Sequence, residues 1–145
     1  MKHPKSYHLS GFLFILILFV QCHHKKNDPT PTTQAEKVTA MLTANTWTMQ
    51  SLTIDGVADN TFFQGLKVTF TATGFTAVNG EPVWPASGTW AYTDANAQSF
   101  KRDDGVVVTI QNISATTLQV SIPWTQTTTG RVSSVSGTHV FTFTK

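Results

Sequence analysis

The sequence predicts an all-β fold, an up-and-down antiparallel barrel of eight strands preceded by a short N-terminal helix. Apolar and polar residues alternate in several stretches, threonine dominates after residue 42 together with aromatic and β-branched residues, and turn residues recur at short, even intervals. An even number of sequential hairpins favours a closed barrel, because closure removes exposed strand edges. A β-sandwich is the alternative, and it would need longer crossovers between its two sheets.

The helix is expected at residues 34–42, where Val38, Met41 and Leu42 recur at the spacing of one apolar stripe. Turn signals such as Asn79-Gly80 and Asp104-Gly105 separate the expected strands. The loop that contains Pro82 and Pro85 is kept out of the sheet, because proline lacks the N–H that a strand ladder needs. The eight expected strands are 47–54, 66–73, 75–78, 88–93, 98–102, 106–110, 118–127 and 132–144.

The alternation also predicts which side chains face the barrel interior. The inward set is Trp47, Met49, Leu66, Val68, Phe70, Trp90, Tyr92, Val106, Val108, Ile110, Leu118, Val120, Ile122, Phe141 and Phe143. The alternation in 66–73 puts Ala72 on the same face as Leu66, Val68 and Phe70. An eight-stranded barrel is either filled by such side chains or holds one small ligand. Each of these residues is therefore either core or the wall of a pocket.

The N-terminal stretch has the organisation of an export signal. Lys2 and Lys5 precede nine apolar residues, 12–20, which is short of the roughly 20 residues that a membrane-spanning helix needs. The lone Cys22 follows directly. The stretch resembles a bacterial lipoprotein signal, although Phe19 and Gln21 stand where that family prefers Leu and a small residue. The resemblance implies removal of residues 1–21 and lipidation of Cys22; the alternatives are an uncleaved anchor or an incidental thiol.

Residues 22–33 are expected to form a flexible tether, because Pro29, Pro31 and several threonines disfavour helix and packing. Cys22, His23 and His24 are residue types that bind metals, but there is no second ligand set at a suitable spacing, so we expect no metal. The tether also lacks the acidic run that resembles a surface-export signal in some lipoproteins. The expected location is the cell envelope, at the outer membrane facing the periplasm.

The charge balance argues against nucleic acid as a partner. Lys2 and Lys5 belong to the signal, which leaves eight basic against eight acidic residues from Cys22 onward. Residues 34–145 are one domain's worth of chain. A single cysteine excludes an internal disulfide, so the fold is held by packing alone.

A family resemblance rests on two motifs. The helix leads into Leu42-Thr43-Ala44-Asn45-Thr46-Trp47, and a later hairpin carries Gly88-Thr89-Trp90. With these motifs the chain resembles the lipocalin-like lipoproteins of Gram-negative bacteria, whose barrels often begin with Gly-x-Trp, the Trp closing the base. Asn45 takes the place of that Gly, and Asn is an ordinary residue that tolerates a left-handed backbone. The resemblance implies the barrel and no particular activity.

No catalytic or cofactor site is expected. His139 is the only histidine after the tether, and no acid, base and nucleophile assemble around it in the sequence. Asp103 and Asp104 precede Gly105 and are interpreted as turn residues. The remaining hypothesis is a small apolar ligand inside the barrel, with Tyr92 and His139 as polar anchors. The candidate ligand-binding residues are Trp47, Phe70, Trp90, Tyr92, His139 and Phe141.

Two further tryptophans leave the function open. Trp84 lies in the proline-flanked loop and Trp124 near a strand end. If exposed, they would form an aromatic rim for a partner protein, a sugar or the membrane interface; otherwise Trp84 is a plug that caps the barrel. The chain is thus either a tethered carrier of a small apolar ligand or a filled barrel that serves as a structural or interaction module beside other envelope proteins.

Overall fold

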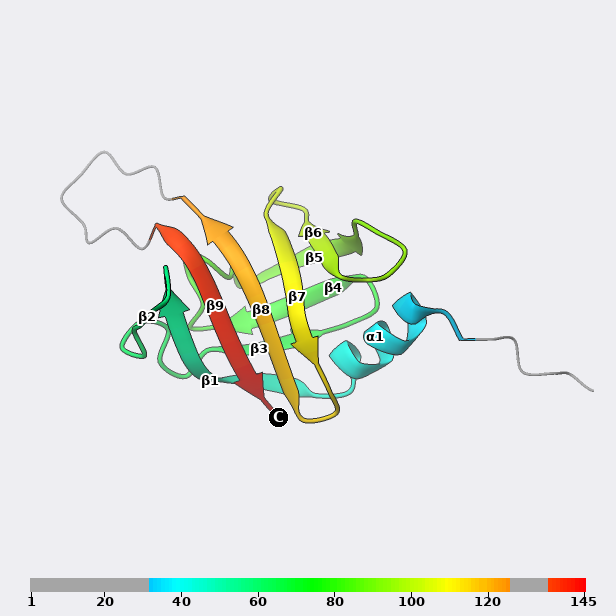
Figure 1. Cartoon of the computed structure of the whole chain (residues 1–145), viewed down its shortest axis with the longest axis horizontal. Coiled ribbons are helices and arrows are strands. Elements are labelled where there is room, and N and C mark those ends of the chain that lie inside the picture. The colour runs from blue at the N-terminus through cyan, green and yellow to red at the C-terminus, as the bar shows by residue number, and fades with distance from the viewer. Residues whose placement is uncertain (1–31, 126–135) are drawn as a thin grey trace, which may run out of the picture. The chain divides into compact units, whose positions relative to one another are not determined.

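Ten elements of secondary structure make up the described residues, 32–125 and 136–145, of the computed structural model (Figure 1). The expected helix and strands are present, with shifted ends. The elements are α1 (Gln34–Thr43), β1 (Thr46–Ile54), β2 (Val57–Ala58), β3 (Lys67–Phe70), β4 (Gly74–Val78), β5 (Ser87–Tyr92), β6 (Ser99–Arg102), β7 (Val107–Ile113), β8 (Thr117–Trp124) and β9 (Gly137–Thr144).

The strands close into the predicted up-and-down barrel. From β3 to β9 each strand pairs antiparallel with the next. The start of β1 pairs with β3, and the rest of β1 pairs with β9, from Thr48↔Thr144 to Ile54↔His139. This β1–β9 ladder closes the barrel and excludes the sandwich. The two-residue β2, which the sequence placed in a loop, is an addition that pairs with the end of β1.

The registers define two ends of the barrel. The helix end has the start of β1, the turns between β3 and β4, β5 and β6, and β7 and β8, and the chain's C-terminus. The loop end has the β1–β2 turn, the β4–β5 loop at residues 79–86, and the β6–β7 turn at residues 103–106. In Figure 1 the helix α1 lies beside the helix end.

Helix α1 begins at a complete capping box. The Thr33 hydroxyl accepts a hydrogen bond from the Glu36 N–H, and the Glu36 carboxylate accepts one from the Thr33 N–H. The helix buries Val38 and Leu42 against the barrel. Trp47 is fully buried just beyond it, and its indole Nε1 donates to the Leu42 carbonyl at 2.9 Å. Trp47 therefore ties α1 to the barrel, while Asn45 is not among the residues with left-handed backbone.

Two β-bulges change which residues face inward. In β1 the register shifts between Met49 and Ser51, so the alternation that starts at Trp47 moves by one residue and buries Leu52. A second bulge lies in β7 between Ile110 and Asn112. Because a bulge inserts an extra residue, strict alternation did not include Leu52 in the inward set.

Some predicted boundaries were wrong. The strand expected at 66–73 ends at Phe70, because the Thr71 hydroxyl accepts a hydrogen bond from the Gly74 N–H and turns the chain. Ala72, expected to face inward, is therefore exposed. The predictions for Cys22, for residues 1–31 and for the strand ends at 126–127 and 132–135 lie outside the described residues.

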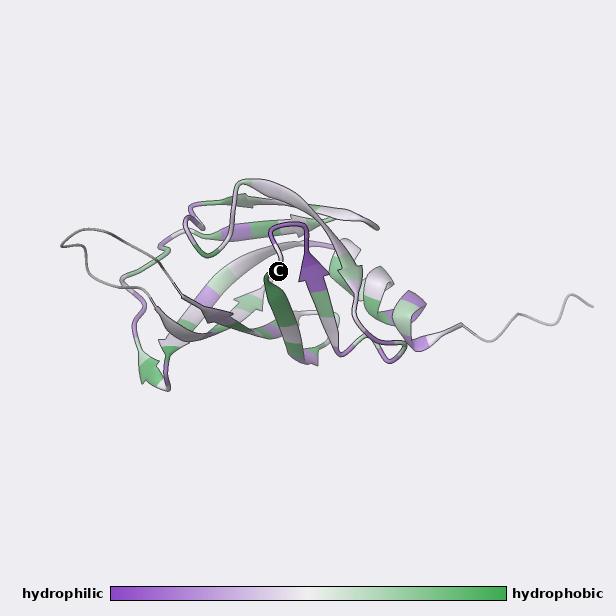
Figure 2. Ribbon diagram, turned by 90° about the horizontal axis from the view of Figure 1, so that it is seen from above, coloured by the Kyte–Doolittle hydropathy of each residue, from purple (hydrophilic) through white to green (hydrophobic). Residues whose placement is uncertain are grey.

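The core is contained within the barrel and its helix. Every residue of the buried apolar cluster lies between Val38 and Phe143, and Pro31–Lys145 form one compact unit. Figure 2 shows the strands enclosing a common interior, with hydrophobic and hydrophilic residues alternating along them. The described core is therefore built from α1, the barrel strands and their connections.

Candidate functional site

The interior holds a network of aromatic rings. Phe70 lies at its centre, with ring centroids 5.8 to 6.4 Å from the four rings of Phe75, Trp84, Trp90 and Phe100. Three of these four pairs are edge-to-face, the arrangement that ring quadrupoles favour. The space around Phe70 is therefore filled by side chains of the protein itself.

Trp84 is a plug and not an exposed rim residue. Its side chain is 1% exposed, and its ring lies 5.7 Å from Phe75 and 6.3 Å from both Phe141 and Phe143. Strands on opposite sides of the barrel thus meet on one loop side chain. Of the two sequence alternatives for Trp84, the structure supports the plug, because an indole in a closing loop buries more apolar area inside than at the rim.

The loop at residues 79–86 is shaped to deliver this indole. A Cβ at Gly80 would lie 2.4 Å from the Trp84 Cβ, so only glycine fits there. The Trp84 N–H donates to the Gly80 carbonyl at 2.7 Å, and the Ala86 N–H donates to the Glu81 carboxylate at 3.1 Å. These contacts therefore hold the loop in one defined conformation.

Arg102 holds the loop from inside and was not identified from the sequence. It is 2% exposed, and its Nη1 donates to the Val83 carbonyl at 2.7 Å. Its guanidinium lies 5.3 Å from the Trp84 ring and 5.8 Å from the Phe75 ring, as in cation–π contacts. Arg102 shares a strand face with Phe100, and this alternation is the signal that could have identified it as an inward residue.

Asp104 balances the charge of Arg102. The Arg102 Nη2 lies 2.5 Å from Asp104 Oδ2, and Nε donates to Oδ1 at 3.1 Å. Burial would raise the pKa of the Asp104 carboxyl, but the hydrogen bonds from Arg102 and Val106 and the Arg102 charge together hold that pKa below its ordinary value. Asp104 is thus both a turn residue, as predicted, and the counter-ion of a buried cation.

His139 lies in the same interior, towards the loop end. It is fully buried, stacks on Phe141 at 5.8 Å and meets the edge of Phe63 at 6.1 Å. Its Nδ1 lies 3.1 Å from the Gly137 carbonyl, which can only accept, so Nδ1 carries the proton. Burial lowers the pKa of the imidazole more than the Gly137 carbonyl and the Asp55 charge raise it, which makes neutral His139 the favoured form.

Three buried polar atoms have no hydrogen-bond partner among the described residues. They are Nε2 of His139 and Nε1 of Trp84 and Trp124. In neutral His139 the Nε2 is an acceptor, whereas the indole groups are donors. Trp124 in β8 pairs with Gly137 in β9, and His139 lies two residues further along β9. The side chains of Trp124 and His139 therefore lie on the same, inward face of the sheet near the loop end. Because buried polar groups are nearly always paired, each of these atoms is a position where a ligand group or a water would be accepted.

The six candidate residues are not gathered in one place. Trp47 lies at the helix end, where its indole bonds to Leu42. Phe70 and Trp90 belong to the packed aromatic network, and Trp90 Nε1 donates to the carbonyls of Thr71 and Gly74. His139 and Phe141 lie together towards the loop end, joined by Phe63. Strand periodicity did not place Phe63 in the interior, because it lies in an irregular loop and has a left-handed backbone.

Tyr92 is half-buried, and its hydroxyl is already in use. The hydroxyl lies 3.0 Å from that of Thr39 in α1, and the ring meets the Trp90 ring edge-to-face at 4.9 Å. Burial raises the pKa of the Tyr92 phenol, which stays protonated at neutral pH. Tyr92 therefore helps to hold α1 against the barrel. Of the six candidate residues, only His139 has a buried polar side-chain atom, Nε2, with no partner among the described residues.

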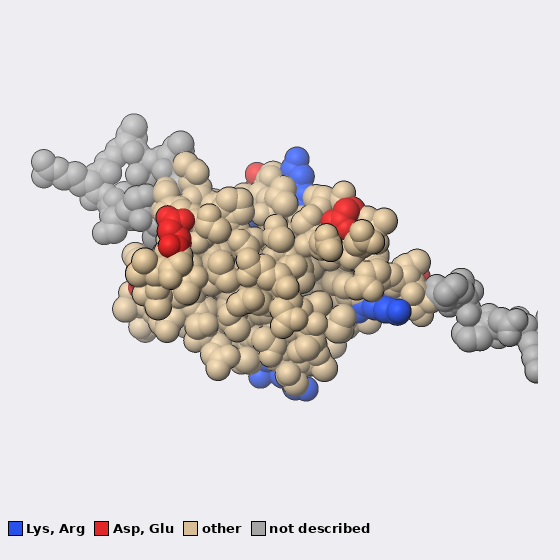
Figure 3. Space-filling model, viewed as in Figure 1, with Lys and Arg blue, Asp and Glu red and all other residues tan. Residues whose placement is uncertain are grey.

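A scan against protein-family models finds no match, and searches of curated proteins and of solved structures find no significant similarity. Among the described residues, no helix is both long and apolar enough to span a bilayer, and no group of three or more potential metal ligands is found. On the face drawn in Figure 3, the described charged side chains lie near the margins. Any function must therefore be inferred from the fold and from the interior polar atoms that lack a partner among the described residues.

Proposed function

We propose that this protein is a lipid-anchored envelope protein whose lipocalin-like barrel binds a small apolar ligand at the loop end, through His139. The observation that carries the proposal is the His139 Nε2, which has no hydrogen-bond partner among the described residues and lies on a ring in contact with Phe63 and Phe141. An apolar wall with few polar anchors is typical of small-molecule sites. The anchor accepts a hydrogen bond, so the ligand carries one O–H or N–H group on an apolar body.

A pair of matched probes tests the ligand proposal. We expect 1-decanol to quench the intrinsic tryptophan fluorescence of the unit from Pro31 to Lys145 and to bind several-fold more tightly than decyl methyl ether, which lacks the donor. The His139→Leu variant removes the acceptor and should abolish this preference. Tyr92→Phe is the control, because its hydroxyl bonds to α1, and it should keep the preference. Failure of both probes to bind up to their solubility limits would refute the proposal.

The anchor is tested separately, on the full chain produced in a Gram-negative host. The proposal predicts a mature N-terminus at Cys22 that carries a diacylglycerol and an N-acyl chain, seen by mass spectrometry. The Cys22→Ser variant should leave the membrane fraction, since two or more acyl chains are needed for stable anchoring. An unmodified Cys22 in protein recovered from the envelope would end this part of the proposal.

A second candidate function is a filled barrel that serves as an envelope interaction or structural module. Its support is the Trp84 plug, which occupies space that a larger ligand would need. It predicts that neither decyl probe binds and that in-cell crosslinking of the full chain yields one defined protein adduct. A protein that stays uncrosslinked and unliganded would argue against both functions.

A further inference from the structure

A groove outside the barrel is lined by five carboxamide side chains. It lies between α1, the β5–β6 turn and β7, at the helix end, and has a volume of about 540 Å³. This is within the range of roughly 300–1,000 Å³ that is usual for small-molecule sites. The carboxamides are those of Gln34, Asn96, Gln98, Gln111 and Asn112. The groove is separate from the loop-end site, and its assignment does not rest on the proposed function.

The lining selects a neutral, hydrogen-bonding ligand. None of the five carboxamide groups forms a side-chain hydrogen bond with another described residue, and all five residues are exposed. Each group offers an acceptor oxygen and two N–H donors. Among the residues that the structure describes, no titratable side chain lines the groove, so this lining supplies no charge to pair with an ionic ligand.

The groove also has an apolar floor. Its apolar lining residues are Val38 of α1 and Ala97 of the β5–β6 turn, which are buried, and Ile110 and Ile113 of β7, which are half-buried. Such a floor accepts the methyl or C–H face of a ligand while the amides bond its polar edge. A ligand that alternates hydroxyl and amide groups with small apolar faces matches both surfaces.

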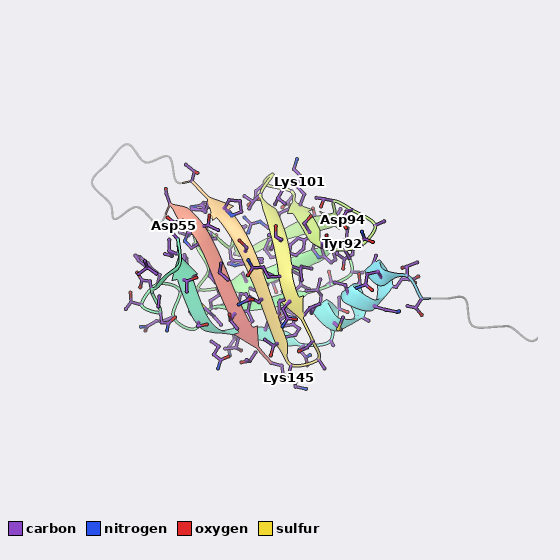
Figure 4. All side chains as sticks on the ribbon, in the orientation of Figure 1. Asp55, Tyr92, Asp94, Lys101 and Lys145 are labelled. Atoms are coloured by element: carbon purple, nitrogen blue, oxygen red, sulfur yellow. The ribbon has the colours of Figure 1, made fainter. Side chains whose placement is uncertain are left out.

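The walls are held in place before any ligand binds. The Asp94 carboxylate accepts hydrogen bonds from the N–H groups of Asn96, Gln98 and Ser99, at 2.8, 3.3 and 3.2 Å. Within this turn Ala97 has a left-handed backbone, with φ of 56°, which is uncommon for a residue other than glycine. Figure 4 shows Asp94 and Tyr92 on the side of the barrel towards α1. A fixed turn lowers the entropy that ligand binding must overcome.

Gln111 is aimed by a β-bulge. It stands between Ile110 and Asn112, where the β7–β8 register shifts, so that neighbouring residues of one strand present their amides on the same edge of the groove. Bulges commonly re-aim side chains beside binding sites. Here the bulge gives adjacent carboxamides where strict alternation would turn one of them inward.

The strand pairing argues against a peptide in this groove. β6 is paired with β5 and β7, and β7 is paired with β6 and β8, so neither strand offers a free edge for an added strand. Recognition must come from side-chain amides. An N-acetylated sugar presents hydroxyls, an amide and a methyl group in one residue, which are the groups that the lining and floor accept.

We infer that the groove between α1 and β7 binds a neutral oligosaccharide that carries N-acetyl groups. The test uses the full chain, ¹⁵N-labelled, in a sugar-free zwitterionic detergent, titrated with tri-N-acetylchitotriose. We expect saturable shifts of the side-chain amide signals of the five groove residues in NMR spectra. The Gln98→Ala/Gln111→Ala variant should bind at least about tenfold more weakly, since each lost hydrogen bond contributes several-fold.

Gln50→Ala is the matched control, because Gln50 is also an exposed glutamine at a β-bulge but lies in β1, outside the groove. It should bind like the unaltered protein. Maltotriose, which lacks N-acetyl groups, should bind more weakly than chitotriose. The inference is overturned if millimolar chitotriose shifts none of the groove signals, if Gln50→Ala weakens binding as much as the double variant, or if tri-alanine shifts the groove signals and chitotriose does not.

Discussion

At the scale of single residues, two buried polar side chains have opposite situations. Arg102 is surrounded by partners: a carboxylate, a carbonyl and two aromatic faces. Among the described residues, His139 has one hydrogen-bond partner, the Gly137 carbonyl, and its Nε2 has none. Burying a polar group costs free energy unless it is hydrogen-bonded, so Arg102 is a completed structural feature and His139 an incomplete one. This contrast is why the proposed ligand is placed at His139.

His139 should make stability depend on pH. The pKa of His139 in the folded protein lies below its ordinary value of 6.5. As the pH falls below 6.5, the imidazole is therefore protonated in the unfolded chain before it is protonated in the folded protein. The free energy of unfolding should therefore fall as the pH drops below about 6.5, by at most about 1.4 kcal/mol per pH unit. Urea unfolding of the full chain at pH 7.5 and 5.5 measures this change. The His139→Phe variant should show a smaller change, and an equal change in both proteins would contradict the assignment.

Asp104 and Asp103 offer a matched pair of substitutions in one turn. Asp104→Asn leaves the buried Arg102 without its counter-ion and should lower the free energy of unfolding by about 2 kcal/mol. Asp103→Asn changes an exposed neighbour whose carboxylate makes no hydrogen bond to a described residue, so its effect should stay within about 0.5 kcal/mol. Urea titration at pH 7 compares the two, and similar losses would count against the pairing.

At the scale of elements, the loop at residues 79–86 contributes a large side chain to the core although it is not a strand. It folds back over the loop end and places Trp84 among rings from β3, β4 and β9. Gly80 allows the close approach, and Arg102 fixes the loop backbone at Val83. Trp84 is thus a core residue that belongs to a loop. Strand periodicity did not identify it because the alternation of apolar residues applies only within strands.

Trp84 and Trp90 should respond differently to the same substitution. Both indoles are buried, but Trp90 Nε1 donates to two carbonyls and Trp84 Nε1 to none of the described residues. Replacement by Phe removes similar volume from each site. Trp90→Phe should therefore be more destabilising than Trp84→Phe by about 1–2 kcal/mol, since it also breaks hydrogen bonds. Thermal unfolding followed by circular dichroism measures the order, and the reverse order would contradict the packing described here.

At the scale of the whole molecule, closure through β1 and β9 joins the two ends of the barrel sequence. The ladder runs from Thr48↔Thr144 to Ile54↔His139, and the core cluster spans only Val38 to Phe143. Each barrel strand has partners on both sides, so the fold needs no added strand to complete it. The hydrogen bonding that makes the barrel is complete within one compact unit, Pro31–Lys145.

A chain that begins at Pro31 should therefore fold by itself. Its midpoint of thermal unfolding should lie within about 3 °C of that of the full chain in the same detergent, because no residue of the described core is removed. Circular dichroism melts compare the two proteins. A truncated chain without a cooperative transition would show that residues 1–30 contribute to the fold.

Pattern alone predicted much of this protein. The period-two alternation and the turn residues determined the all-β class, the eight barrel strands, the helix and most inward side chains, because each is a local property of a half-buried strand. The errors of this prediction also have local causes. Leu52 was missed because a bulge adds one residue to β1, and Ala72 was wrongly placed inward because Thr71 ends β3 early.

What only the tertiary structure decided are the features that depend on distant residues. The pairing of β1 with β9, the burial of Trp84, the use of the Tyr92 hydroxyl by Thr39 and the isolation of the His139 Nε2 all arise between segments far apart in the chain. The sequence by itself determined which residues prefer a strand and which face of each strand is apolar. The closed barrel then decided which polar groups are satisfied, because hydrogen-bond partners inside a protein are set by where the chain brings them in space.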